Sequence, residues 1–166
     1  FAVGSTDLSN YVLPTSVSGT GTITAKPLTL AATANNKPYD GNLVATVTGY
    51  GLSGMVGLET LTINSAAANF NSKDVLTANT VTITGIGLTN GTGTNAGLAA
   101  NYSVANTTTA TAQITPKAMT ISGITAANKV YDGSTNATVN GGGAQYGGLV
   151  GLDEVNVLAS GVFVDK

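Results

Sequence analysis

The side chains best suited to chemistry in this sequence lie in a short motif that occurs twice. The first copy is Lys37, Tyr39, Asp40 and Gly41, and the second is Lys129, Tyr131, Asp132 and Gly133. A phenol, an ammonium group and a carboxylate could bind a polar ligand or exchange protons. The chain has no His and no Cys, however, and its six cations are all Lys. Acid–base catalysis at neutral pH therefore lacks an imidazole, and covalent catalysis lacks a thiol.

Carboxylates alone can serve a glycosidase or bind calcium, so the acidic residues form a second group of candidates. Glu59 returns as Asp153, which Glu154 follows, and Asp40 returns as Asp132, so these acids recur with a repeat. Calcium needs several converging oxygen ligands, and the sequence contains no Asp-x-Asp-x-Asp loop. We expect no enzyme activity and no cofactor, with calcium at a junction between repeats as the alternative.

The Asp-Gly pair of the motif favours a tight turn. Glycine accepts a positive φ at little cost, and the Asp side chain can bond to nearby backbone. A tyrosine ring can cover one end of a β-domain while its hydroxyl stays hydrated or hydrogen-bonded. The motif therefore predicts a structural hairpin plug. A ligand site at Tyr39 and Asp40, and again at Tyr131 and Asp132, is the alternative.

The motif belongs to a longer repeat whose order never changes. Asn10-Tyr11 returns as Asn101-Tyr102 at an offset of 91, and the loop 54–59 returns as 148–153 at an offset of 94. With Lys26 and Lys117 as starting points, residues 1–25 are the end of one unit. Residues 26–116 are a complete unit, and 117–166 are the first half of the next. The chain opens with Phe1 and not with Met, and its first residues do not have the pattern of a secretion signal. We therefore expect it to be a piece of a longer protein.

Alternation of apolar and hydroxyl side chains indicates strands with one buried face. We expect such strands at 22–24, 28–30, 44–48, 61–63, 81–84, 102–104, 109–114 and 155–157. Gly- and Asn-rich stretches at 49–54, 85–97 and 140–148 predict loops, and residues 65–69 could form a helical turn. The prediction is an all-β chain of tandem Ig-like β-sandwich units of about 90 residues each.

The two Lys-x-Tyr-Asp-Gly copies resemble the signature of the YDG domain. The Asn-Tyr pair at 101–102 and Ile-Thr-Pro-Lys at 114–117 are similar to the segment that ends such repeats. Bacterial Ig-like repeats of the MBG type look similar as well. The resemblance implies tandem β-domains in very large exported bacterial proteins of the filamentous-haemagglutinin and adhesin kind. It implies no catalytic residues. The first copy departs from the pattern at Pro27 and Pro38.

These observations predict the stalk of a secreted or cell-surface adhesin, in which neighbouring repeats of the chain are the main partners. Two alternatives stay open: a subunit of a self-assembling extracellular filament or biofilm matrix fibre, and a module that binds a glycan or host surface. Only 8% of the residues are charged and the net charge is −2, which disfavours nucleic-acid binding. No apolar run has the roughly 18 residues of a membrane span. We expect an extracellular location on the bacterial surface.

Overall fold

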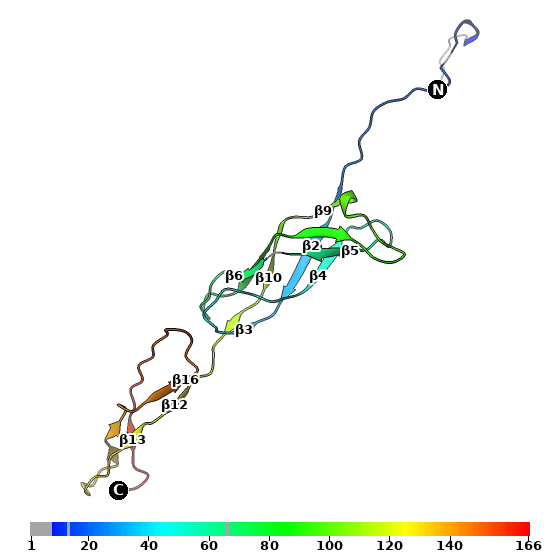
Figure 1. The fold of residues 1–166 in the computed structure, drawn as a ribbon. Helices are drawn as coiled ribbons and strands as arrows, with labels where there is room; N and C mark the ends of the chain where they lie inside the picture. Colours follow the sequence, from blue (N-terminus) through cyan, green and yellow to red (C-terminus); the bar gives the residue numbers. More distant parts are fainter. Residues whose placement is uncertain (1–7, 13, 66) are drawn as a thin grey trace.

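The computed structural model describes residues 8–12, 14–65 and 67–166, and it is nearly all β. The chain is elongated, with a strand-rich body at 26–116 followed end to end by a smaller one (Figure 1). The helices in the described part are two 3₁₀ turns, η1 (Leu8–Asn10) and η2 (Ala99–Asn101). Neither turn has the length or the apolar character that a membrane-spanning helix requires.

The first body contains eleven of the strands. They are β1 (Lys26–Pro27), β2 (Thr29–Ala34), β3 (Lys37–Pro38), β4 (Val47–Ser53), β5 (Leu61–Asn64), β6 (Ala67–Phe70), β7 (Thr80–Thr84), β8 (Gly87–Asn90), β9 (Tyr102–Ser103), β10 (Thr107–Thr111) and β11 (Ile114–Thr115). Antiparallel pairing forms the three-stranded sheet β10–β7–β6 and the pairs β2–β4 and β5–β8. Two short pairs, β1–β9 and β3–β11, are parallel.

The core of the first body is built by the inward residues of the three-stranded sheet and of β11. Val81 and Ile83 of β7 and Ile114 of β11 are its largest fully buried side chains. Side chains of β2 and β4 pack against this cluster from the other side. This packing follows the alternation in the sequence, because successive residues of a strand point to opposite faces. The sheets are small and open, so the Ig-like β-sandwich arrangement stays a prediction.

The second body has shorter strands and no fully buried side chain among its described residues. Its strands are β12 (Thr120–Ser122), β13 (Thr125–Ala126), β14 (Asn136–Ala137), β15 (Val139–Asn140), β16 (Gln145–Gly147) and β17 (Gly161–Val162). They pair as β12–β16, β13–β15 and β14–β17, all antiparallel. Residues 117–166 correspond to the first half of 26–116 and contain no counterpart of β7 or β10.

Several local predictions from the sequence are wrong. The expected loop 49–54 is largely part of β4, and the expected loops 85–97 and 140–148 contain β8 and β16. The helical turn expected at 65–69 is replaced, over its described residues, by the start of strand β6. No strand forms at 22–24 or 155–157. The strands expected at 28–30, 61–63 and 81–84 are confirmed with shifted ends, whereas the one expected at 109–114 is divided into β10 and β11.

Candidate functional site

Lys37 is the centre of the first motif copy. Its ammonium group lies 2.8 Å from a carboxylate oxygen of Asp40. It also donates hydrogen bonds to the backbone oxygen and the side-chain oxygen of Asn42, at 3.0 and 2.9 Å. The same group lies over the ring of Phe70, 5.7 Å from its centroid. Strand β3 ends one residue before Tyr39, and the turn that follows it is held by contacts of Asp40 and Asn42 with the Lys37 ammonium group.

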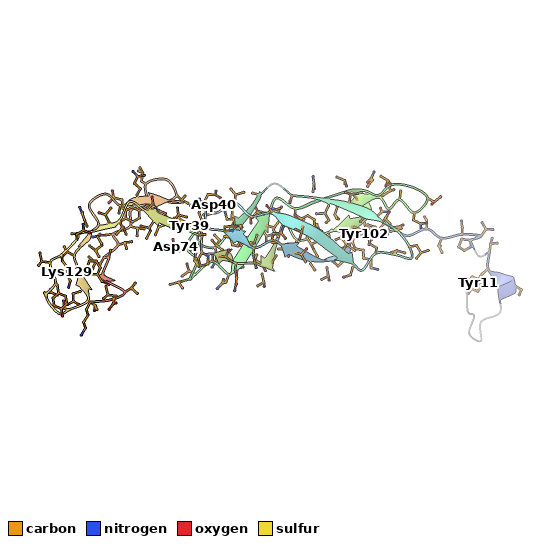
Figure 2. The ribbon with its side chains drawn as sticks, turned by 90° about the horizontal axis from the view of Figure 1, so that it is seen from below. Tyr11, Tyr39, Asp40, Asp74, Tyr102 and Lys129 are labelled. Carbon is orange, nitrogen blue, oxygen red and sulfur yellow. The ribbon has the colours of Figure 1, made fainter. Side chains whose placement is uncertain are left out.

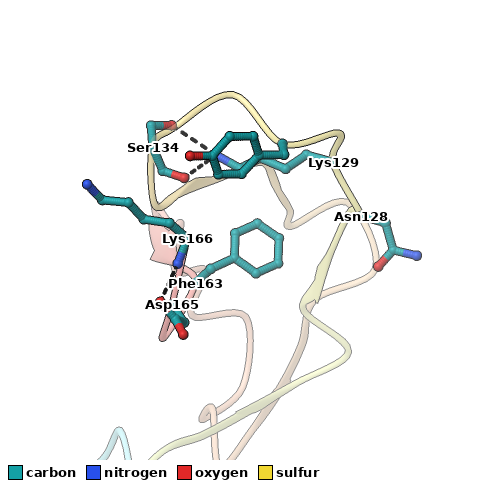
Figure 3. Close-up of a pocket in the computed structure, with 7 residues that line it drawn as sticks. Asn128, Lys129, Ser134, Phe163, Asp165 and Lys166 are labelled. Atoms are coloured by element: carbon teal, nitrogen blue, oxygen red, sulfur yellow. Dashed lines mark hydrogen bonds between the residues drawn. The ribbon is translucent and has the colours of Figure 1, made fainter.

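The second copy repeats this arrangement with different neighbours in sequence. The ammonium group of Lys129 lies 2.8 Å from Asp132 and donates to the backbone oxygen and the hydroxyl of Ser134, at 2.8 and 2.9 Å. It lies 5.7 Å from the centroid of the Phe163 ring, and Figure 3 shows Lys129, Ser134 and Phe163 lining one hollow. A Lys, an Asp and an aromatic ring thus meet in the same way twice.

The Asp-Gly turn has the expected backbone geometry in both copies. Gly41 and Gly133 have φ values of 78° and 76°, a conformation that favours glycine. The Asp side chain accepts a hydrogen bond from the backbone two residues on, which is Asn42 in the first copy and Ser134 in the second. The turn is not part of a hairpin, however, because β3 pairs in parallel with the distant strand β11.

These contacts lower the pKa of both motif carboxyls. The hydrogen bond from Lys129 is the largest cause at Asp132, followed by the backbone and side chain of Ser134, and it lowers the pKa from 3.8 to about 2. At Asp40 the hydrogen bond from Lys37 likewise lowers the pKa. Both carboxylates are substantially exposed, so each ion pair adds little to stability. For Asp132 that contribution is complete above pH 3.8 and disappears as the pH falls through about 2.

Replacing Lys129 by Met is expected to raise the pKa of Asp132 from about 2 toward 3.8, because the largest cause of the shift is removed. The pKa can be read from the pH dependence of the carboxyl ¹³C chemical shift of Asp132. Lys166→Met is the control, since Lys166 lines the same hollow but is not a cause of the shift. An unchanged pKa in the Lys129 variant would contradict the ion-pair account.

The two motif tyrosines differ in burial. Tyr39 is half-buried and packs against the core cluster, and it lines a groove together with Asp153 of the second body. Tyr131 is 78% exposed. Figure 2 shows Tyr39 beside Asp40 and Asp74 at the end of the first body that faces the second. The Lys–Asp–Phe arrangement is therefore common to both copies, whereas the surroundings of the two tyrosines differ.

The second pair of predicted tyrosines is placed differently. Tyr102 begins β9 and is buried, and its hydroxyl donates to the Glu59 carboxylate and accepts from the backbone N–H of Val56. The hydrogen bond to Glu59 raises the pKa of Tyr102. Tyr11 lies in the described segment 8–12, outside any strand, and is exposed. The structure thus gives Tyr102 a structural contact that Tyr11 does not share.

The aromatic partner of the motif lysine is a residue that sequence reasoning missed. Phe70 and Phe163 are 93 positions apart, inside the range of the repeat offset, and the chain has three Phe in all. A comparison of the rare aromatic residues at the repeat offset would have found them. Phe70 is buried at the end of β6, so its ring serves both the core and the motif cation.

The described residues offer little for a metal. Over 8–12, 14–65 and 67–166, no three acidic side chains gather in a group that could hold an ion. Lys26 and Glu59 line a groove with Asn101 and Tyr102 at the other end of the first body, where Lys26 pairs with Tyr102 through β1 and β9.

Comparison with known proteins gives one family. The family model described as the YDG domain matches residues 24–110 and 115–166. Searches of curated proteins and of solved structures gave no match. The matched stretches include both motif copies and most of the chain, so the protein belongs to the YDG domain family.

Proposed function

We propose that this chain is a stalk section of a large secreted or cell-surface bacterial adhesin, built from Ig-like β-sandwich units at 26–116 and from 117 onward. The observation that carries the proposal is the repeated Lys–Asp–Phe arrangement, with equal ion-pair and ring distances in two bodies that follow each other end to end. Repeated bodies placed end to end make the protein longer, because each copy adds length without adding new functional groups.

The short connection between the bodies supports the same proposal. Strand β11 ends at Thr115, Pro116 follows, and β12 begins at Thr120. Proline fixes φ and restricts the residue before it, so the connection is stiffer than a Gly/Ser linker of equal length. A stalk that holds a distal head away from the cell needs such stiff, short joints.

Assembly into an extracellular filament is a second candidate, and the edge of the three-stranded sheet favours it. Strand β10 (Thr107–Thr111) lies at the edge of the order β10–β7–β6, and residues 75–116 carry no charge. Edge strands are usually protected from intermolecular pairing by charges, Pro or bulges. Electron microscopy of the purified chain separates the two candidates, since single rods support a stalk and regular polymers support a filament.

Surface exposure of the unit on cells tests the proposed function directly. Antibodies raised against residues 26–116 should label intact cells that carry the gene, and brief protease treatment of those cells should remove the label. Antibodies against a cytoplasmic protein provide the control for lysis. Labelling that appears only after the cells are permeabilised would overturn the proposed location and the stalk with it.

A further inference from the structure

A groove lies between the two bodies and is lined by both. Tyr39 and Val75 come from the first body, and Lys117, Val150 and Asp153 are among the residues that line it from the second. A Cβ placed on Gly41 would lie 3.0 Å from Cγ1 of Val150, so the motif turn is in close contact with the loop of the next unit. The equivalent Gly133 has nothing within 4 Å of such a Cβ.

The topology of the first body brings the motif tyrosine to this place. The backbone N–H of Tyr39 donates to the carbonyl of Thr115 at 2.9 Å, as an extension of the parallel β3–β11 pair. Thr115 is two residues before Lys117, where the next unit begins. Any unit whose last strand pairs with its motif strand therefore holds the motif tyrosine beside the start of the following unit.

The loop that reaches Tyr39 is itself a repeated element. Residues 148–153 repeat 54–59, and Gly148 and Gly151 have φ values of 94° and 60°, against 98° and 56° at Gly54 and Gly57. The same turn hydrogen bond closes both loops, from Asp153 N–H to the Val150 carbonyl at 3.0 Å and from Glu59 N–H to the Val56 carbonyl at 3.1 Å. The loop thus keeps one shape, whether or not a motif tyrosine lies against it.

We propose that the tyrosine of the motif is a docking residue between successive YDG units: Tyr39, Gly41 and Val75 receive the loop Gly148–Asp153 of the following unit. The partner of this surface is another YDG unit, recognised by an acidic residue at the end of a Gly-x-Val-Gly-Leu loop. The contact would fix the orientation of neighbouring units relative to each other. This role rests on the proposed stalk function.

The polar contact of this joint pairs a phenol with a carboxylate. The Asp153 carboxylate lines the groove beside Tyr39 and is the first cause of the raised pKa of Tyr39, ahead of partial burial and of the charges of Asp74 and Asp40. Glu59 shows that a carboxylate at this position is suited to a phenol, since it accepts the hydroxyl of Tyr102. A carboxylate has about four lone-pair sites, so one acid can serve a tyrosine of its own unit and one of the unit before.

The joint can be tested by measuring the spread of distances between the two bodies of the 166-residue chain. Because the chain has no Cys, spin labels can be attached at Thr62→Cys and Thr138→Cys, both exposed and outside the groove. Double electron–electron resonance should give one narrow distance distribution. Tyr39→Phe, which keeps the ring, and Asp153→Ala should each lower the ratio of docked to undocked molecules by roughly 3- to 10-fold.

Matched variants and a double mutant make the result specific. Tyr131→Phe and Glu154→Ala are the same changes at the exposed copy of the tyrosine and at the acid next to Asp153, and they should leave the distribution unchanged. The combined Tyr39→Phe and Asp153→Ala variant should broaden it no further than either change alone, since both remove one interaction. A broad distribution in the unaltered chain, or narrow ones in all variants, would overturn the joint. Both outcomes are independent of the surface-labelling experiment, which tests the proposed stalk function separately.

Discussion

The Ile114→Ala variant is expected to lose about 2–5 kcal/mol of the free energy of unfolding of the first body. Ile114 is 2% exposed and is among the largest fully buried side chains. It lies on β11, which pairs with the motif strand β3, so the cavity would open next to the motif. A domain of this size has a total stability of only about 5–15 kcal/mol, and a loss on this scale should be plain in a urea titration followed by circular dichroism.

The repeat supplies a matched control for this variant. Ile23 occupies the position equivalent to Ile114 at an offset of 91, but it is fully exposed. Ile23→Ala should therefore change the unfolding free energy by less than about 0.5 kcal/mol. Equal effects of the two substitutions would mean that the packing around β11 is not what stabilises the body.

Gly91→Ala is expected to destabilise the first body by about 1–3 kcal/mol or more, because the new methyl group has no room. A Cβ at this position would lie 1.9 Å from the carbonyl oxygen of Thr60 and 2.7 Å from its carbonyl carbon. These atoms cannot move freely, since the Thr60 carbonyl accepts the N–H of Gly97 at 2.9 Å and Gly91 N–H donates to the Gly97 carbonyl at 3.0 Å. The midpoint of urea unfolding measures the loss.

Two other glycines turn this prediction into a graded series. A Cβ on Gly87 would meet the side-chain oxygen of Asn64 at 2.6 Å, which can rotate away, and one on Gly21 would meet nothing within 4 Å. We expect Gly91→Ala to be the most destabilising, Gly87→Ala intermediate and Gly21→Ala close to neutral. A Gly91 variant as stable as the Gly21 variant would show that the close approach of this loop to Thr60 does not exist in solution.

The sequence predicted well where alternation was uninterrupted and poorly where glycine interrupted it. Residues 81–84 alternate Val, Thr, Ile and Thr, and they form most of β7. Gly49 and Gly51 suggested a loop, yet they belong to β4 and pair with Thr33 and Ala31. The alternation of burial is interrupted at Gly49 and Tyr50 and resumes after them, and pairing with β2 provides the hydrogen bonds that a turn would have used.

The misassigned segment 65–69 illustrates the limit of local preference. Alanine favours helix over strand, and the run of alanines here suggested a helical turn. The strand β6 forms instead because it pairs with β7 over four residues and buries Phe70. Contacts between positions so far apart in sequence cannot be read from a window of a few residues.

The candidate site was predictable in its geometry but not in its partners. The Asp-Gly turn follows from two neighbouring residue types, whereas the hairpin expected around it does not form. The ring of Phe70 comes from a strand some thirty residues later in the chain, and the carboxylate facing Tyr39 comes from the next body. Only the repeat offset, applied to Phe and to the acidic residues, indicates these contacts from sequence.

The parallel pairs at the two ends of the first body have a consequence for a chain under load. The chain enters beside β1 and β9 and leaves beside β3 and β11, at opposite ends (Figure 1). A pull on the two ends would slide each terminal strand along its parallel neighbour, so that bonds such as Leu28 N–H to the Ser103 carbonyl, at 2.8 Å, are loaded together in shear. Resistance to stretching would then depend on the barrier to unfolding and not on the equilibrium stability.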